Sequence, residues 1–124
     1  MHLRLLERDT DTGLGEDYSI RLGKGAIARI KLERLSPDHA WIDWVFVPPA
    51  HRGEGLAGQL MQAVLQDADA AGVRVSLEPR ACAGPAQAKL EAWYRAYGFC
   101  DSGRRGDFGP IFVREARAPL SRAA

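Results

Sequence analysis

Polar and apolar residues alternate through much of the first half of the chain. Residues 18–22, 26–35 and 40–47 place β-branched, aliphatic and aromatic side chains between polar ones, with short turns separating the stretches. This alternation predicts three β-strands, because successive side chains of a strand point to opposite faces of a sheet. The short connections favour antiparallel pairing, so we expect a meander, with residues 3–8 as a further, weakly patterned strand.

The period of the pattern changes after Pro48–Pro49, which end the third strand because proline cannot donate a ladder hydrogen bond. Apolar residues then recur every three or four positions, which predicts a helix that ends near Gly72. The apolar face of this helix is Leu56, Leu60, Met61, Val64, Leu65 and Ala68. Residues 73–77 read as a strand and residues 85–97 as a second helix, with Gly98 as its C-terminal cap.

A strand, a helix and a strand in this order predict a right-handed crossover between parallel strands. Residues 99–102 and 111–115 are predicted to close the sheet. The pattern therefore indicates an α+β fold: a mixed sheet with an antiparallel N-terminal meander, one parallel β-α-β crossover, and helices on its faces. For 124 residues we expect a single domain over residues 1–115, followed by a frayed tail over residues 116–124.

Composition and charge narrow the classes of function. The 17 basic and 16 acidic residues give a formal net charge of +1, so no global field favours nucleic acid or an anionic membrane. The local concentration of basic residues is Arg104, Arg105, Arg114 and Arg117. A solvated end of the sheet explains these arginines equally well, and we expect no nucleic-acid partner.

No apolar run approaches the ~20 residues that span a bilayer, and the N-terminus lacks the apolar core of a signal peptide, so we expect no membrane partner. The two cysteines, Cys82 and Cys100, stand in no CxxC or Cys/His spacing, so we expect no metal site. A reduced, cytoplasmic chain fits this cysteine usage best.

A glycine-rich turn between the third strand and the first helix carries the strongest chemical signal. Gly53, Gly55 and Gly58 let the backbone approach a ligand closely, and the first amides of the helix are unsatisfied donors at its positive end. The turn therefore predicts an anion site of pyrophosphate size. It is neither a dinucleotide GxGxxG motif, because the preceding meander is antiparallel, nor a P-loop. Taken alone, the glycines also fit an ordinary tight connection.

Residues 52–57, with the sequence RGEGLA, resemble the signature Gln/Arg-x-x-Gly-x-Gly/Ala of the GCN5-related N-acetyltransferases. Residues 47–52 resemble that family's Val-x-Pro-x-Tyr-Arg approach, and residues 90–99 resemble its Leu-Tyr-x-x-x-Gly-Phe segment. The resemblance covers about residues 40–99. It implies that an acetyl group moves from acetyl-CoA to a primary amine of an acceptor, by direct attack in a ternary complex.

The resemblance also implies which residues hold the donor. It assigns cofactor contacts to Val45, Phe46, Val47, Arg52, Gly53, Glu54, Gly55, Leu56, Ala57, Gly58 and Gln87. The amides near residues 45–47 would pair with pantetheine and polarise the thioester carbonyl. Tyr94, four residues before Gly98, stands where the family has the tyrosine that protonates the coenzyme A thiolate. The alternative for Tyr94 is a core aromatic residue with a satisfied hydroxyl.

Asp43 is the candidate general base. Strict alternation predicts that one face of its strand consists of Trp41, Asp43, Val45 and Val47. From that face the carboxylate could take a proton from the incoming ammonium, directly or through water. Asp43 could equally well pair with Arg29 or Lys31 on the neighbouring strand. Glu78, at the end of the next strand, is the alternate base.

The N-terminal region departs from the family's pattern. Between Met1 and Tyr18 there is too little chain for the two helices that roof the family's acceptor site. Three arrangements follow: an open cleft, a cleft completed by a second subunit in a homodimer, or a cleft built for a bulky protein amine rather than a small molecule. Residues 78–85 could form one wall. The missing roof also leaves a second hypothesis, a module that binds coenzyme A or only keeps the fold.

Overall fold

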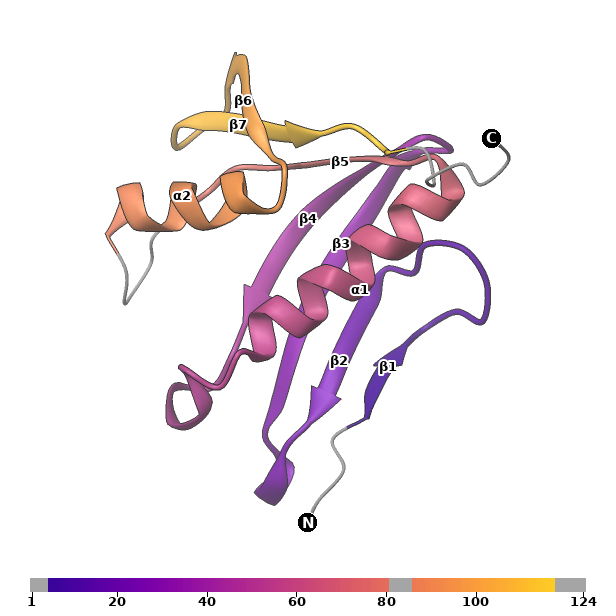
Figure 1. Ribbon diagram of the computed structural model, residues 1–124, viewed down its shortest axis with the longest axis vertical. Helices are drawn as coiled ribbons and strands as arrows, with labels where there is room; N and C mark the ends of the chain where they lie inside the picture. The colour runs from indigo at the N-terminus through magenta and orange to yellow at the C-terminus, as the bar shows by residue number, and fades with distance from the viewer. Residues whose placement is uncertain (1–4, 81–85, 118–124) are drawn as a thin grey trace, which may run out of the picture.

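A computed structural model describes residues 5–80 and 86–117. Within them, seven strands form one mixed sheet in the order β1-β2-β3-β4-β5-β7-β6, and two helices pack against it (Figure 1). The strands are β1 (Leu6–Arg8), β2 (Asp17–Arg21), β3 (Ile27–Ser36), β4 (His39–Phe46), β5 (Arg74–Leu77), β6 (Cys100–Arg105) and β7 (Pro110–Arg114). The helices are α1 (Leu56–Ala71) and α2 (Gln87–Ala96). The predicted α+β class is confirmed.

The order of the strands follows the predicted topology. The first four strands pair antiparallel in sequence order, and β4 then pairs parallel with β5 after the α1 crossover. β7 lies between β5 and β6 and is antiparallel to both. Between β1 and β2 the described residues 9–16 form a loop without a helix, as the short N-terminal region predicts.

The core lies between α1 and the sheet, and α1 crosses one face of the sheet over β2 and β3 (Figure 1). The side chains of Leu60, Met61 and Val64 are fully buried there. Burying one aliphatic side chain of this size contributes ~1.5–3 kcal/mol, so this face anchors the helix. Gly72 ends α1 with a φ of 70°, from which its amide reaches the carbonyl of Asp69.

The β3–β4 ladder contains a bulge at Asp43. Lys31 pairs with Trp44 and the next residue, Leu32, pairs with Ile42, so Asp43 has no residue opposite it. An extra residue of this kind reverses the inward and outward alternation of the strand beyond it. Asp43 and Trp44 are therefore both exposed.

Because of the bulge, the two faces of β4 differ from the predicted ones. Beyond it, Val45 and Val47 pack against the core that already contains Ile42. The prediction that one face consists of Trp41, Asp43, Val45 and Val47 is therefore wrong. Strict alternation holds only for an unbulged strand, and Asp43 is separated from Val45 by the reversal.

The C-terminal elements differ from the prediction in their bounds. α2 begins at Gln87 rather than at Pro85, which lies outside the described residues. β6 extends to Arg105 because it forms a hairpin with β7. The start of the predicted tail is held in place, since the amide of Arg117 donates to a carboxylate oxygen of Asp69 at 2.9 Å.

A buried ion pair ties these C-terminal elements to α1. The guanidinium of Arg114 on β7 is 5% exposed and donates two hydrogen bonds to Asp69, at 2.7 and 3.1 Å. Its Nε donates to the carbonyl of Tyr97 at the end of α2, at 2.9 Å. Arg114 thus connects three elements, β7, α1 and the end of α2.

Within the described ranges, no helix is long and apolar enough to cross a membrane.

Candidate active site

The sheet splits between β4 and β5. These parallel strands pair over only three residues, the last pair being Trp41 and Ser76, and then separate. A groove of about 760 Å³ opens beyond that point, lined by residues 42–47 of β4 and its exit and by residues 77 and 78 of β5 and its exit. Among the described residues, the edge of β4 that faces the groove therefore has no strand partner beyond Trp41, and its amides and carbonyls are available to a ligand.

The glycine-rich turn closes one end of this groove. A short 3-10 turn, Pro49–His51, follows β4, and Arg52 fixes the approach by donating from Nε to the carbonyl of Val47 at 3.2 Å. Gly53 and Gly55 have φ angles of 86° and 79°, in the left-handed region that favours glycine.

The first turn of α1 presents free donors to the groove. Gly55 is the N-cap and supplies no side-chain hydrogen bond, and the first turn contains no acidic residue. The amides of Leu56, Ala57 and Gly58 have no hydrogen-bond partner within residues 5–80 and 86–117. Three converging amides at the positive end of a helix form an anion site.

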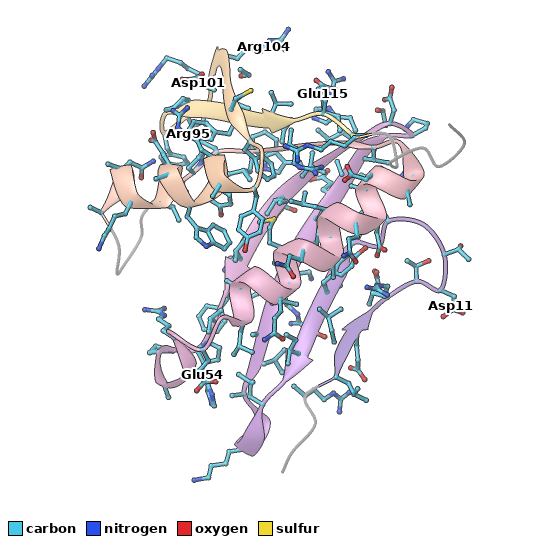
Figure 2. The ribbon with its side chains drawn as sticks, viewed as in Figure 1. Asp11, Glu54, Arg95, Asp101, Arg104 and Glu115 are labelled. Atoms are coloured by element: carbon cyan, nitrogen blue, oxygen red, sulfur yellow. The ribbon has the colours of Figure 1, made fainter. Side chains whose placement is uncertain are left out.

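Most of the sequence-predicted cofactor residues meet in this groove. Those that line it are Val45, Phe46, Val47, Arg52, Gly53, Gly55, Leu56, Ala57 and Gly58. Glu54 and Gln87 are not among its lining residues. Figure 2 shows Glu54 on the turn before α1, and Gln87 donates to the carbonyl of Pro79 at 2.9 Å, which ties the start of α2 to the exit of β5. The role of every residue of the predicted set as a cofactor contact stays a prediction.

Tyr94 lines the groove from α2. Its side chain is 6% exposed, and its ring packs edge-on against Trp93 and Phe99, with centroids 5.1 and 5.8 Å away. The hydroxyl has no hydrogen-bond partner in the described part of the chain. Burial raises the pKa of Tyr94 to about 12. The side chain is therefore protonated at neutral pH and can donate, but not accept, a proton.

Two carboxylates lie in the groove, and the structure gives them different surroundings. The Glu78 carboxylate accepts a hydrogen bond from the amide of Phe108 in the β6–β7 hairpin, and it lies so close to Gly106 that a Cβ there would collide with it. Asp43 is exposed and has no ion pair or hydrogen bond to the residues the structure describes. The Arg29 that could have paired with it binds Asp17 at 3.1 Å.

A family model described as GCN5-related N-acetyl-transferase matches residues 17–81, more than half of the chain. The chain belongs to the GCN5-related N-acetyltransferase family. The match spans β2 to β4, the glycine-rich turn, α1 and β5, and so covers the β4 and α1 sides of the groove. No curated protein sequence matches the chain.

Solved structures confirm the fold of this acetyltransferase. The ribosomal-protein-S18-alanine N-acetyltransferase from Escherichia coli has a TM-score of 0.64 at 18% identity, over 87% of this chain and 72% of that one. Ard1 from Thermoplasma volcanium has a TM-score of 0.65 at 20% identity, over 83% and 72% of the two chains. An Elizabethkingia anophelis family member with acetyl-CoA bound has a TM-score of 0.65 at 15% identity, over 80% and 74%.

The groove of this acetyltransferase also contains residues that sequence reasoning did not assign. They are Ile42, Trp44, Leu77, Arg80, Lys89, Leu90 and Trp93, together with His51 of the turn. One of them has a signal in the sequence: Leu90 lies four residues, about one helical turn, before Tyr94 and therefore on the same face of α2. The sequence gives no signal of this kind for Arg80. Its guanidinium lies 3.6 Å from the ring centroid of Phe108, a residue far from it in the sequence that only the folded chain brings close.

Proposed function

We propose that this family member transfers an acetyl group from acetyl-CoA to a primary amine of an acceptor, by direct attack in a ternary complex. The observation that carries the proposal is the meeting in one groove of the unpaired β4 edge, the free amides of α1, Asp43 and Tyr94. Membership of an acetyltransferase family supports the reaction. The Elizabethkingia anophelis structure with acetyl-CoA bound supports the donor.

The groove fits an elongated anionic thioester at both ends. At the turn, the amides of residues 56–58 would hold the pyrophosphate, and the left-handed glycines keep that surface free of side chains. Along β4, the unpaired backbone of residues 45–47 would hydrogen-bond to the pantetheine amides as an added strand does. When bound, acetyl-CoA supplies the activated acetyl group.

The side chains supply the proton transfers. Asp43 accepts a proton from the ammonium of the acceptor, which leaves a neutral amine able to attack. A backbone amide near Val45 donates to the carbonyl oxygen as negative charge develops on it. Tyr94 donates its proton to the departing sulfur, a role for which a hydroxyl with a pKa of about 12 stays protonated at physiological pH.

Asp43 is preferred to Glu78 as the base because of their partners. Glu78 already accepts a hydrogen bond from the Phe108 amide, so taking a proton would weaken a contact that holds the β6–β7 hairpin. Asp43 has no such contact in the described residues. The single domain over residues 1–115, a cytoplasmic location and a homodimer stay predictions.

Thiol release from acetyl-CoA in the presence of a panel of primary amines tests the proposal. We expect amine-dependent release by the native chain and a loss of about 10²-fold in kcat for Tyr94→Phe, the contribution typical of a general acid. Tyr97→Phe is the matched control, because Tyr97 is the C-cap residue of the same helix and is not among the residues that line the groove.

The same assay distinguishes the proposed enzyme from the second hypothesis, a module that binds coenzyme A or only keeps the fold. Binding of acetyl-CoA with no turnover of any amine would favour a coenzyme A-binding module. A chain that binds no acetyl-CoA would refute both the enzyme and the module.

A further inference from the structure

One face of the sheet beside the groove is left uncovered by the helices that the structure describes. Gly58 on α1 and Tyr97 at the end of α2 lie in contact, since a Cβ on Gly58 would be 2.8 Å from the Tyr97 hydroxyl. Both helices therefore pack on the same side of the sheet, and Figure 1 shows no helix of the described chain on the other side. We call the uncovered surface of β3 and β4 the open face; its paired residues include Arg29, Lys31 and Glu33 on β3 and Phe46, Trp44 and Trp41 on β4.

The bulge at Asp43 gives the open face an aromatic edge at the groove. Trp44 is 46% exposed and stacks on Phe46, with ring centroids 5.3 Å apart and planes 14° apart. Both residues also line the groove, next to Asp43. The open face is thus continuous with the place where the proposed base lies.

The donor and the acceptor would approach from opposite sides. The anion site, Tyr94 and Trp93 belong to the helices, so the helix side of the groove is the one that fits the donor. A ternary complex then leaves the open face as the route for the amine. This step rests on the proposed function.

The shape of the open face selects the size of the acceptor. Small-molecule sites are concave and enclose most of their ligand, whereas an uncovered sheet face encloses none. Protein interfaces combine aromatic anchors with a polar rim, which matches a tryptophan and a phenylalanine beside exposed Lys31 and Glu33. The rim carries both signs of charge, unlike a surface for nucleic acid.

We propose that the open face is the docking surface for a polypeptide acceptor, whose apolar side chain next to the reactive amine packs on Trp44 and Phe46. The segment crosses β4 near the bulge and presents its amine to Asp43. The acceptor is therefore a protein or peptide amine rather than a free small amine.

Acceptors of increasing length test this proposal. Acetyl-CoA is offered with acceptors of three lengths: single-residue amides, tripeptide pools and decapeptide pools. Each length is prepared in two sets. The first set has a free N-terminus and no lysine, and the second has a blocked N-terminus and one central lysine. We expect kcat/KM per amine to be about tenfold higher for decapeptides than for single-residue amides in at least one set, the gain expected of one aromatic anchor.

Variants assign that gain to the open face. Trp44→Ala should bring peptides and single-residue amides to equal kcat/KM, and Trp44→Phe should keep most of the difference. Leu5→Ala is the control, an exposed apolar residue before β1 at the other edge of the sheet, and should leave the ratio unchanged.

Three results would overturn the proposal. The first is equal kcat/KM for all lengths in both sets. The second is a Trp44→Ala variant that changes a dimer into a monomer in light scattering, which would make the face an interface between copies of the chain. The third is acetyl-CoA binding without acetylation of any amine, which refutes the proposed function as well and is distinguished from the first by the absence of turnover.

Discussion

The contact between Gly58 and Tyr97 gives a quantitative test of how α1 and α2 are held together beside the groove. In a helix alanine is more stable than glycine by about 1 kcal/mol, so Gly58→Ala would stabilise an isolated α1. In this structure the new Cβ would lie 2.8 Å from the Tyr97 hydroxyl, closer than ordinary van der Waals contact. Overpacking of this kind costs about 1–3 kcal/mol, so we expect a net loss of up to about 2 kcal/mol.

Removing the Tyr97 hydroxyl should reverse the sign of the change in stability that Gly58→Ala causes. In a Tyr97→Phe background the atom that meets the new Cβ is gone, and Gly58→Ala should then stabilise by up to about 1 kcal/mol. The assay is urea unfolding of the native chain, both single variants and the double variant, and the expected coupling energy is about 1–3 kcal/mol. Equal effects of Gly58→Ala in both backgrounds would refute the contact, and with it the packing of both helices on one side of the sheet.

Three further predictions concern charge and backbone. Asp69→Asn leaves the buried guanidinium of Arg114 without its carboxylate and should cost about 3 kcal/mol at neutral pH. Burial raises the pKa of Asp69, but the hydrogen bonds and positive charges of Arg114 and Arg117 outweigh it and lower the pKa below its usual value. The stabilisation is therefore present above the unfolded-state pKa and is lost as pH falls through the folded-state pKa. Urea unfolding of the native chain and of Asp69→Asn should converge in acid, and a difference that stays constant with pH would contradict this. For Tyr94, the raised pKa of about 12 predicts that kcat shows no loss from its ionisation between pH 7 and 10, which a pH profile checks. Gly55→Ala, at a φ of 79°, should cost about 1 kcal/mol and weaken acetyl-CoA binding measured by calorimetry, whereas unchanged affinity would argue against the turn as the anion site.

The side of the groove proposed for the donor could be predicted from the sequence because its requirements are local. Gly53 and Gly55 are needed where the backbone turns left-handed, and the helix that follows shows its apolar face by spacing alone. Tyr94 could be placed because it stands at a fixed distance before Gly98, which ends α2 with a φ of 98°.

The side proposed for the acceptor could not be predicted in the same way because it depends on pairing between strands. The bulge at Asp43 exists only in the register of β3 with β4 and leaves no mark in the residues of β4. It reversed the predicted faces, and it placed Asp43 and Trp44 together on the exposed side. Glu78 shows the same limit, since its partner Phe108 lies thirty positions further along the chain.

Gln87 makes contacts that its place in the sequence does not predict. It is the first residue of α2, and its side-chain amide donates to the carbonyl of Pro79 and to the carboxylate of Glu91, while its role as a cofactor contact stays a prediction. A polar side chain at a helix start serves the nearest unsatisfied group, and here that group belongs to the exit of β5.

The central claim is that one groove holds the acyl donor between the β4 edge and the start of α1, with Asp43 and Tyr94 at the reacting end. A crystal structure of the chain with coenzyme A tests it most directly. The account predicts the pyrophosphate on the amides of residues 56–58 and the thiol within hydrogen-bonding reach of the Tyr94 hydroxyl. A pyrophosphate bound elsewhere, or a thiol directed away from both Tyr94 and Asp43, would contradict it.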